Sequence, residues 1–213
     1  MIISHSHKYV YVSVPKAGTH TMYRLLREKY DGEHLGILEG RKTMSPHHMR
    51  HIPGGCESYF KFTSVRNPFS RAVSLWWTIT QTNVPGTKYR DTYLPMIGGE
   101  SFVEFARWNL KWETNGSGRI WFFMPQHRWL ETVKRFDALL HMEKMLEEFN
   151  ALRFVEKPLE QLAPVMERRH DRAPWWEHYD HEAISLVRMW AGPDFKAYGY
   201  PADFERAKEL GNI

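Results

Sequence analysis

A lysine and a glycine lie between an expected buried strand and an expected helix in YVYVSVPKAGTHT, residues 9–21. Backbone N–H groups at a helix N-terminus have no intrahelical partner, and the helix dipole adds partial positive charge there. Gly18 lets the main chain approach an anion closely, and Lys16 supplies a full positive charge. Further side-chain donors follow at Thr19, His20 and Thr21. The pattern favours an anion-binding loop of the kind that holds phosphate; the alternative is an ordinary helix start with Thr19 as the N-cap and a solvated Lys16.

The position of the lysine excludes one common kind of phosphate loop. Lys16 stands two residues before Gly18, whereas the Walker nucleotide loop GxxxxGK[ST] has its lysine directly after the last glycine, and that pattern does not occur in the chain. The pattern alone leaves open which anion suits a lysine at the strand end.

A second stretch, VRNPFSRAVS at 65–74, also leads from a strand end into a helix. If Pro68 starts the turn, Ser74 lies one to two helical turns in and is able to share an anion with Arg66. A guanidinium binds phosphate as a fork, and a hydroxyl donates beside it. The alternative is that Arg66 and Arg71 are surface charges. Two such loops in one small domain predict a ligand with two separated anionic ends.

The elements that must position these loops alternate between strand and helix. Buried strands are expected at 8–14, 59–68 and 135–143, and helices at 19–30, 70–81, 101–112, 143–151 and 181–195, the last closed by Gly192-Pro193. The remaining segments are expected to be a loop-rich 31–58, a surface excursion at 82–100 and a break at 116–119. This alternation predicts an α/β fold, with residues 1–213 as a single domain and a parallel sheet flanked by helices.

Composition and charge narrow the classes of function. The chain has 213 residues, of which 42% are apolar and 25% charged, as in ordinary globular domains. Its formal net charge of +4 mildly favours anionic ligands, but the basic residues form no long tract, so no nucleic-acid partner is expected. A single Cys56 excludes an intrachain disulfide, and neither a signal peptide nor a membrane-spanning run is evident. We therefore expect a cytoplasmic protein without membrane insertion.

The two loops resemble those of a known enzyme family. VPKAGTHT resembles the 5′-phosphosulfate loop, and VRNPFSRAVS the 3′-phosphate motif, of sulfotransferases that use 3′-phosphoadenosine 5′-phosphosulfate (PAPS). Later blocks that resemble the carbohydrate sulfotransferase branch are 123–130, 135–149 and 186–200. The similarity spans residues 8–200 and implies a P-loop-NTPase-like fold. It also implies in-line transfer of a sulfuryl group to a hydroxyl or amine of a carbohydrate or small hydroxyl compound.

The resemblance also implies roles for individual residues. Lys16 would contact the 5′-phosphosulfate and its bridging oxygen, and Ala17, Gly18, Thr19, His20 and Thr21 would wrap that group, although the role of His20 stays open. Arg66 and Ser74 would hold the 3′-phosphate. The basic segment RRHDRAPWWEHYD at 168–180 would close over the nucleotide, with Arg172 or Arg169 as the contact, or else form a solvated loop. No metal is expected, because HExxH and CxxC are absent.

The acceptor hydroxyl needs a general base, and histidine suits that task near neutral pH. The sequence favours His48, then His47 and His51, in SPHHMRH before the second strand; the alternative is that these histidines are exposed and inert. Glu143 and Glu57 are weaker candidates. Two other functions stay open: a binding module for 3′-phosphoadenosine 5′-phosphate (PAP) without turnover, and a nucleotide kinase of related α/β fold.

Overall fold

The computed structural model describes residues 1–34, 37–38, 41–42, 51–80, 89–114, 121–162 and 173–211. The chain forms two compact units. We call Met1–Arg66 with Trp129–Asp171 the sheet unit, and Asn67–Arg128 with Arg172–Ile213 the helical unit. The assignment of residues 1–213 to one domain stays a prediction.

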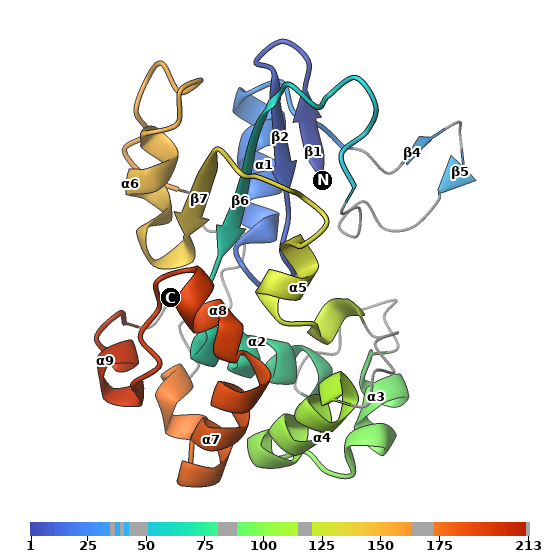
Figure 1. Ribbon diagram of the computed structural model, residues 1–213, viewed down its shortest axis with the longest axis vertical. Coiled ribbons are helices and arrows are strands. Elements are labelled where there is room, and N and C mark those ends of the chain that lie inside the picture. Colours follow the sequence, from blue (N-terminus) through green and yellow to red (C-terminus); the bar gives the residue numbers. More distant parts are fainter. Residues whose placement is uncertain are drawn as a thin grey trace. The chain divides into compact units, whose positions relative to one another are not determined.

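The sheet unit is built on five strands in the order β3-β1-β2-β6-β7 (Figure 1). Their bounds are β1 (Ile2–Ser4), β2 (Tyr9–Val12), β3 (Glu33–His34), β6 (Phe60–Val65) and β7 (Ala138–His141). Strands β2, β6 and β7 are parallel, as predicted, but β1 runs antiparallel to both β2 and β3. The sheet is therefore mixed. The chain passes from β1 to β2 within four residues, and so short a connection joins only antiparallel strands.

Two further strands lie in the expected loop-rich region. β4 (Ile37–Leu38) and β5 (Arg41–Lys42) pair antiparallel with each other and form a separate two-stranded sheet. The prediction for 31–58 included no strands, whereas the described residues of that region contain β3, β4 and β5.

Helices α1 (Thr19–Lys29) and α6 (Met145–Asn150) pack against one face of the five-stranded sheet. The strands turn alternate side chains toward this face, including Tyr9, Tyr11 and Phe62, because successive residues of a strand point to opposite sides. The helix expected at 19–30 is confirmed as α1, which buries Met22, Leu25 and Leu26 along one face. Figure 1 shows α1 behind β1 and β2, and α6 beyond β7 at the sheet edge. This packing holds β2 and α1, and hence the loop between them, in place.

The parallel strands bring three loops to one edge of the sheet. Val12 pairs with Thr63 and Val65 pairs with His141, so β2, β6 and β7 end near the same level. The residues that follow them are the Lys16 loop, Arg66 and the 3₁₀ turn Met142–Lys144. In α/β proteins, ligands bind outside the carboxyl ends of parallel strands.

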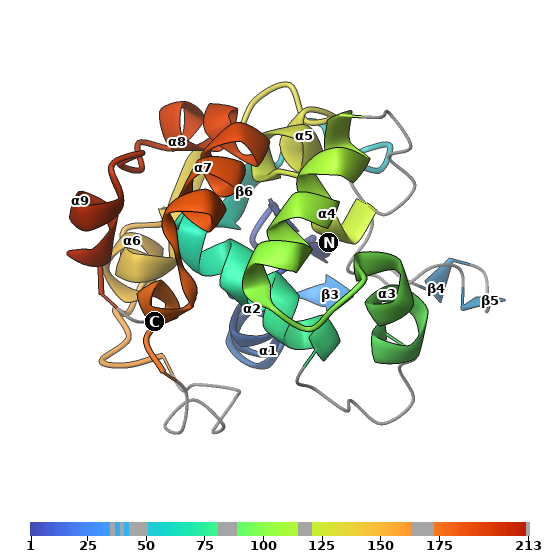
Figure 2. The ribbon, with the colours of Figure 1, turned by 90° about the horizontal axis from the view of Figure 1, so that it is seen from below.

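The helical unit consists of helices alone in the part of the chain that the structure describes. Its elements are α2 (Pro68–Thr80), α3 (Tyr89–Ile97), α4 (Phe102–Thr114), η2 (Trp121–Phe123), η5 (Trp175–His178), α7 (His181–Trp190), α8 (Gly192–Ala197) and α9 (Phe204–Lys208). The short α5 (Gln126–Leu130) lies where the chain passes back into the sheet unit. Figure 2 shows α4 and α7 side by side, and the two helices are in contact.

Helix α2 begins where the motif VRNPFSRAVS predicts a turn. The Asn67 side chain accepts a hydrogen bond from the Phe69 N–H at 3.0 Å, and Pro68 occupies the first helical position, where a missing N–H costs nothing. The chain therefore turns from the strand directly into the helix that carries Ser74.

Two expectations about the helices need correction. Residues 82–100 were expected to be a surface excursion without a helix; most of 91–100 is exposed, as expected, but the segment contains α3, which includes Pro95 in its second half. The helix expected at 181–195 ends at Trp190, and α8 begins at Gly192 with Pro193 in its first turn. A proline at that position suits a helix start, so Gly192-Pro193 begins α8 instead of lying within one continuous helix.

Candidate functional site

The loop between β2 and α1 has an unusual backbone. Lys16 has φ +67° and Gly18 has φ +79°, so both lie in the left-handed region. A non-glycine residue seldom adopts this conformation, and strained residues of this kind cluster at functional sites. The loop is closed by a hydrogen bond from the Ala17 N–H to the Val14 carbonyl at 3.2 Å. The sheet unit thus holds Lys16 in a defined and uncommon conformation.

Thr19 is not the N-cap that the ordinary reading of the loop required. Gly18 occupies that position without a side-chain cap, while the Thr19 hydroxyl donates to the Val14 carbonyl at 2.8 Å. The first turn of α1 contains no acidic residue. Lys16 is half-buried rather than fully solvated. The positive end of α1 is therefore neither capped by a side chain nor neutralised by a carboxylate of its own first turn.

Gly18 is favoured by its φ and also lies against the end of a methionine side chain. A Cβ atom at this position would lie 2.7 Å from Met145 Cε and 3.9 Å from Met142 Cγ, the first of which is closer than real Cβ contacts allow. The turn that follows β7 thus lies directly against the loop that follows β2. No side chain larger than hydrogen fits at residue 18 without movement of Met145.

Two buried hydroxyls hold the loop from beneath. Ser64 Oγ in β6 donates to the Ala17 carbonyl at 2.6 Å. Tyr11 OH lies 2.7 Å from Ser64 Oγ, and it acts as the donor because the single Ser64 proton goes to Ala17. Sequence reasoning missed both residues. A small polar residue within the buried run of β6 was the available signal.

Arg66 is buried, with 7% of its surface exposed, so it is not the surface charge considered as the alternative. Its Nη1 donates to the main-chain carbonyl of Lys16 at 3.5 Å. The structure therefore brings the Arg66 side chain into contact with the main chain of Lys16, 50 positions earlier in the sequence. Ser74 lies in α2 of the helical unit, where it is half-buried.

His20 lies in the first turn of α1, and its side chain is exposed. Partial desolvation lowers the pKa of His20, and the positive charge of Lys16 lowers it further. The ring is therefore mainly neutral at pH 7. Thr21, the last residue of the predicted loop, is half-buried.

Several predicted residues lie outside the described part of the chain: His47, His48, Arg169 and Arg172. Of the weaker candidates for the base, His51 and Glu57 are exposed, and Glu143 is half-buried in the turn after β7.

Sequence reasoning missed a histidine–carboxylate pair at the sheet edge. Nδ1 of His141, the last residue of β7, lies 2.9 Å from Glu148 Oε1, and the main-chain N–H of His141 donates to Glu148 Oε2. The two side chains are 29% and 25% exposed. The signal in the sequence was a histidine at the end of an expected strand, followed seven residues later by a glutamate in the next expected helix.

Arg71, within the second motif, has a structural role in the helical unit. It is fully buried, and its Nη2 donates to the Met124 carbonyl at 3.0 Å. Burial lowers the pKa of Arg71 to about 10, although the nearby Asp194 acts in the opposite direction. Asp194 also accepts hydrogen bonds from the Gln126 and His127 N–H groups, both at 2.8 Å. Arg71 is thus a buried core cation rather than a surface charge.

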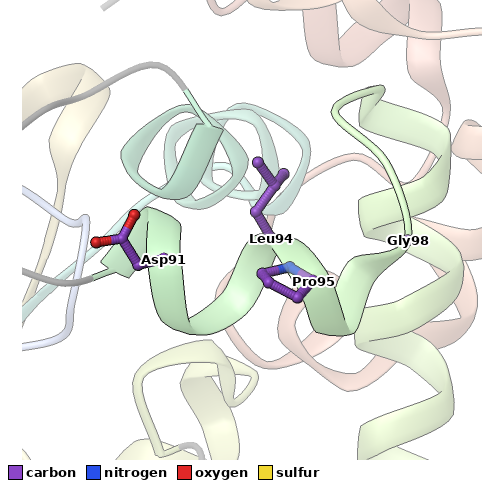
Figure 3. Close-up of a pocket in the computed structure, with 4 residues that line it drawn as sticks. All are labelled: Asp91, Leu94, Pro95 and Gly98. Atoms are coloured by element: carbon purple, nitrogen blue, oxygen red, sulfur yellow. The ribbon is translucent and has the colours of Figure 1, made fainter.

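An open hollow of about 500 Å³ lies on α3, lined by Asp91, Leu94, Pro95 and Gly98 (Figure 3). None of the candidate residues lines it, and its one charged group is a carboxylate, which repels anions. We do not assign it to the site.

The described residues lack the side-chain clusters and the helices that a metal site or a membrane span would need. No cluster of three or more histidine, cysteine, aspartate or glutamate side chains there has the geometry to hold a metal ion. None of the helices in those ranges combines the length and apolar character that crossing a membrane requires.

A family-level comparison covers both loops. The sequence model of the sulfotransferase family matches residues 1–201. The chain belongs to the sulfotransferase family. The family consists of PAPS-dependent enzymes, which confirms the resemblance drawn from the two loops and identifies the protein as a sulfotransferase. Comparison with curated proteins and with solved structures gives no match.

Proposed function

We propose that this sulfotransferase moves a sulfuryl group in line from PAPS to a hydroxyl or amine of its acceptor, a carbohydrate or a small hydroxyl compound. The observation that carries the proposal is the contact between Arg66 Nη1 and the Lys16 carbonyl, which joins a buried arginine to the main chain of the glycine loop. That loop lies at the carboxyl edge of the parallel strands. The cytoplasmic location stays a prediction.

The β2–α1 loop suits the 5′-phosphosulfate. In the proposed complex, the main chain of Ala17 to Thr21 surrounds the anion, and Lys16 neutralises charge at the oxygen that bridges phosphorus and sulfur. Negative charge builds on that oxygen as the bond to sulfur breaks. A donor aimed at such a position commonly contributes a factor of about 10²–10³ to the rate.

The 3′-phosphate is assigned to Arg66 and Ser74, with Arg172 as a further contact. A buried guanidinium at a strand end provides a strong, planar donor for a phosphate. Two points support the assignment of Ser74 to the 3′-phosphate. Helix α2 begins two residues after Arg66, and VRNPFSRAVS resembles the family motif. The ligand would then join the two loops through its two phosphate groups.

A different function is a nucleotide-binding protein or kinase of related α/β fold without sulfuryl transfer. The absence of GxxxxGK[ST] speaks against a Walker-type kinase. Such a kinase would bind ATP with magnesium, whereas the proposed enzyme prefers a nucleotide with phosphates on both the 3′ and 5′ positions.

Calorimetric titration separates these possibilities. We expect PAP to bind more tightly than AMP, which lacks the 3′-phosphate, and ATP with magnesium to bind weakly. Arg66→Ala should lower PAP affinity by about 10- to 100-fold, toward that of AMP, because it removes a charge-assisted hydrogen bond. Arg24→Ala, which removes an exposed arginine of α1, is the matched control. A folded protein that does not bind PAP would refute the proposal.

A further inference from the structure

We propose that Ser64, supported by Tyr11, is a positioning residue of the nucleotide site: it turns the Gly18 N–H toward the 5′-phosphosulfate. The inference rests on the proposed function and concerns two residues to which sequence reasoning assigned no role. Three features carry it: two buried hydroxyls beneath the loop, the planarity of the peptide that they hold, and an amide that the loop itself does not use.

Ser64 and Tyr11 form a short buried chain of hydrogen bonds that ends on the loop. Both residues are fully buried. Tyr11 OH lies 2.7 Å from Ser64 Oγ, and Ser64 Oγ donates to the Ala17 carbonyl at 2.6 Å. Burial raises the pKa of Tyr11, so the phenol keeps its proton and remains a donor. Because the Ser64 proton lies on the Ala17 carbonyl, Ser64 accepts from Tyr11, and the chain runs in one direction from β2 through β6 to the loop.

The peptide between Ala17 and Gly18 transmits this direction. A peptide unit is planar and trans, so its carbonyl and its N–H point to opposite sides, and no cis peptide occurs among the described residues. Because Ser64 holds the Ala17 carbonyl toward β6, the Gly18 N–H points away from β6, at the N-terminus of α1. That end of the helix carries the partial positive charge of the helix dipole.

The loop does not use this amide for its own closure. The Ala17 N–H donates to the Val14 carbonyl at 3.2 Å, and the same carbonyl accepts from the Thr19 hydroxyl at 2.8 Å. The Gly18 N–H, in contrast, has no acceptor among the residues that the structure describes. An outward-facing N–H at a helix start that lacks a protein acceptor suits an oxygen of the 5′-phosphosulfate.

Ser64 thus acts on the nucleotide without touching it. In the proposed complex the Gly18 N–H donates to an oxygen of the 5′-phosphate, the group that leaves with PAP. A donor that is already oriented does not have to be reorganised when negative charge builds there. Loss of the Ser64 hydroxyl would leave the Ala17 carbonyl without its buried donor, so that the peptide carrying the Gly18 N–H is able to turn.

An NMR titration with PAP reads the Gly18 amide directly. The sequence contains two Ala–Gly peptides, 17–18 and 191–192, so isotope labels at the alanine carbonyl carbon and the glycine nitrogen select two amide signals. We expect PAP to shift the Gly18 amide proton downfield, as a new hydrogen bond to phosphate requires, while Gly192 at the start of α8 is the reference. A Gly18 signal that stays in place while calorimetry shows bound PAP would overturn the inference.

Ser64→Ala tests what sets this orientation. We expect it to lower PAP affinity by about 5- to 50-fold and to reduce the Gly18 shift, because the Ala17 peptide loses its donor. Thr63→Val is the matched control, since Thr63 is equally buried in β6 and its hydroxyl donates to the Val12 carbonyl at 2.7 Å, in the strand rather than the loop. The two variants should lose similar stability in urea, but Thr63→Val should change PAP affinity less than about threefold. Equal effects on PAP affinity would contradict a positioning role.

Tyr11→Phe removes the second hydroxyl and keeps the ring. PAP affinity should fall by a smaller factor than in Ser64→Ala, and the double variant Tyr11→Phe/Ser64→Ala should bind PAP no more weakly than Ser64→Ala, because Tyr11 acts through Ser64. Wild-type PAP affinity in both single variants would overturn the inference and leave the proposed function intact. A folded wild-type protein that does not bind PAP would overturn both.

Discussion

The Arg66 guanidinium donates to the main-chain carbonyl of Lys16 at 3.5 Å, so the end of β6 is joined to the loop that follows β2. The bond involves the main chain of Lys16 rather than its side chain, and it helps to fix the backbone that carries that side chain. In a sulfotransferase this contact links the residue proposed for the 3′-phosphate with the residue proposed for the 5′-phosphosulfate. Changes at either end are therefore expected to affect the binding of the same nucleotide.

Gly18→Ala should destabilise the protein and weaken PAP binding. Alanine at residue 18 would have to adopt a φ near +79°, which side chains disfavour. Its methyl group would also lie 2.7 Å from Met145 Cε. Gly55→Ala is a matched control, since Gly55 has φ +83° but nothing within 4 Å of its Cβ position. We expect Gly55→Ala to cost about 1 kcal/mol in the free energy of unfolding and Gly18→Ala about 1–3 kcal/mol more. Urea denaturation measures both; equal losses would contradict the packing argument.

Arg71→Met should reduce the free energy of unfolding by about 3–5 kcal/mol. The substitution leaves the buried Asp194 carboxylate and the Met124 carbonyl without the guanidinium. Arg107→Met is the control, because Arg107 pairs with Glu182 on the surface, where ion pairs contribute about 0–1 kcal/mol. Chemical denaturation at pH 7 gives both values. A loss below about 1 kcal/mol for Arg71→Met would contradict a core role.

PAP binding should be accompanied by proton uptake in mildly acidic solution. In the free protein, partial desolvation and the charge of Lys16 lower the pKa of His20. A bound anion beside the ring favours its charged form and raises that pKa, so the complex binds more protons than the free protein. PAP affinity should then rise as the pH falls through this range. Calorimetry in buffers of different ionisation enthalpy measures the uptake.

His20→Gln is the variant that identifies the source of the protons. It should reduce proton uptake while leaving a folded protein that still binds PAP through the loop amides. Uptake that is unchanged in His20→Gln would show that another group titrates on binding.

His34 should make the protein less stable in mild acid. It packs edge-on against Tyr23, with ring centroids 4.7 Å apart, and burial is the main reason that its pKa is lowered to about 4. Between the ordinary value of 6.5 and about 4, the unfolded chain therefore binds more protons at this residue than the folded one. As the pH is lowered through this window, the free energy of unfolding therefore falls, by up to about 1.4 kcal/mol per pH unit.

Urea denaturation from pH 7 to pH 4.5 measures this slope. His34→Gln should flatten it, whereas His51→Gln, which changes an exposed histidine, should leave it unchanged. Identical slopes in all three proteins would exclude His34 as the cause.

The elements that hold the loops were predictable because their apolar spacing is regular. Strands β2, β6 and β7 and helices α1, α2 and α4 all lie where strand or helix periodicity indicated them. β1 was missed because a three-residue strand carries no readable period and forms only by pairing with β2. α3 was missed because Pro95 and the flanking glycines indicate a loop, and tertiary packing overrides that preference.

Within the site, the residue types were readable and their contacts were not. The pattern PKAGTHT identified Lys16 and Gly18, but not the left-handed φ of Lys16 or the Ser64 hydroxyl under the loop. The pairing of His141 with Glu148 depends on a strand end and a helix meeting in three dimensions. Spacing along the chain does not encode such a contact.

The transfer of radiolabelled sulfate from PAPS tests the central claim most directly. Wild-type protein, Lys16→Ala and Lys29→Ala, which removes an exposed lysine of α1, are incubated with PAPS and the acceptor panel. We predict labelled product and PAP in equal amounts for wild type and Lys29→Ala, and a rate about 10²–10³-fold lower for Lys16→Ala. Transfer that is equally fast in folded Lys16→Ala, or no transfer to any acceptor by wild type, would contradict the account.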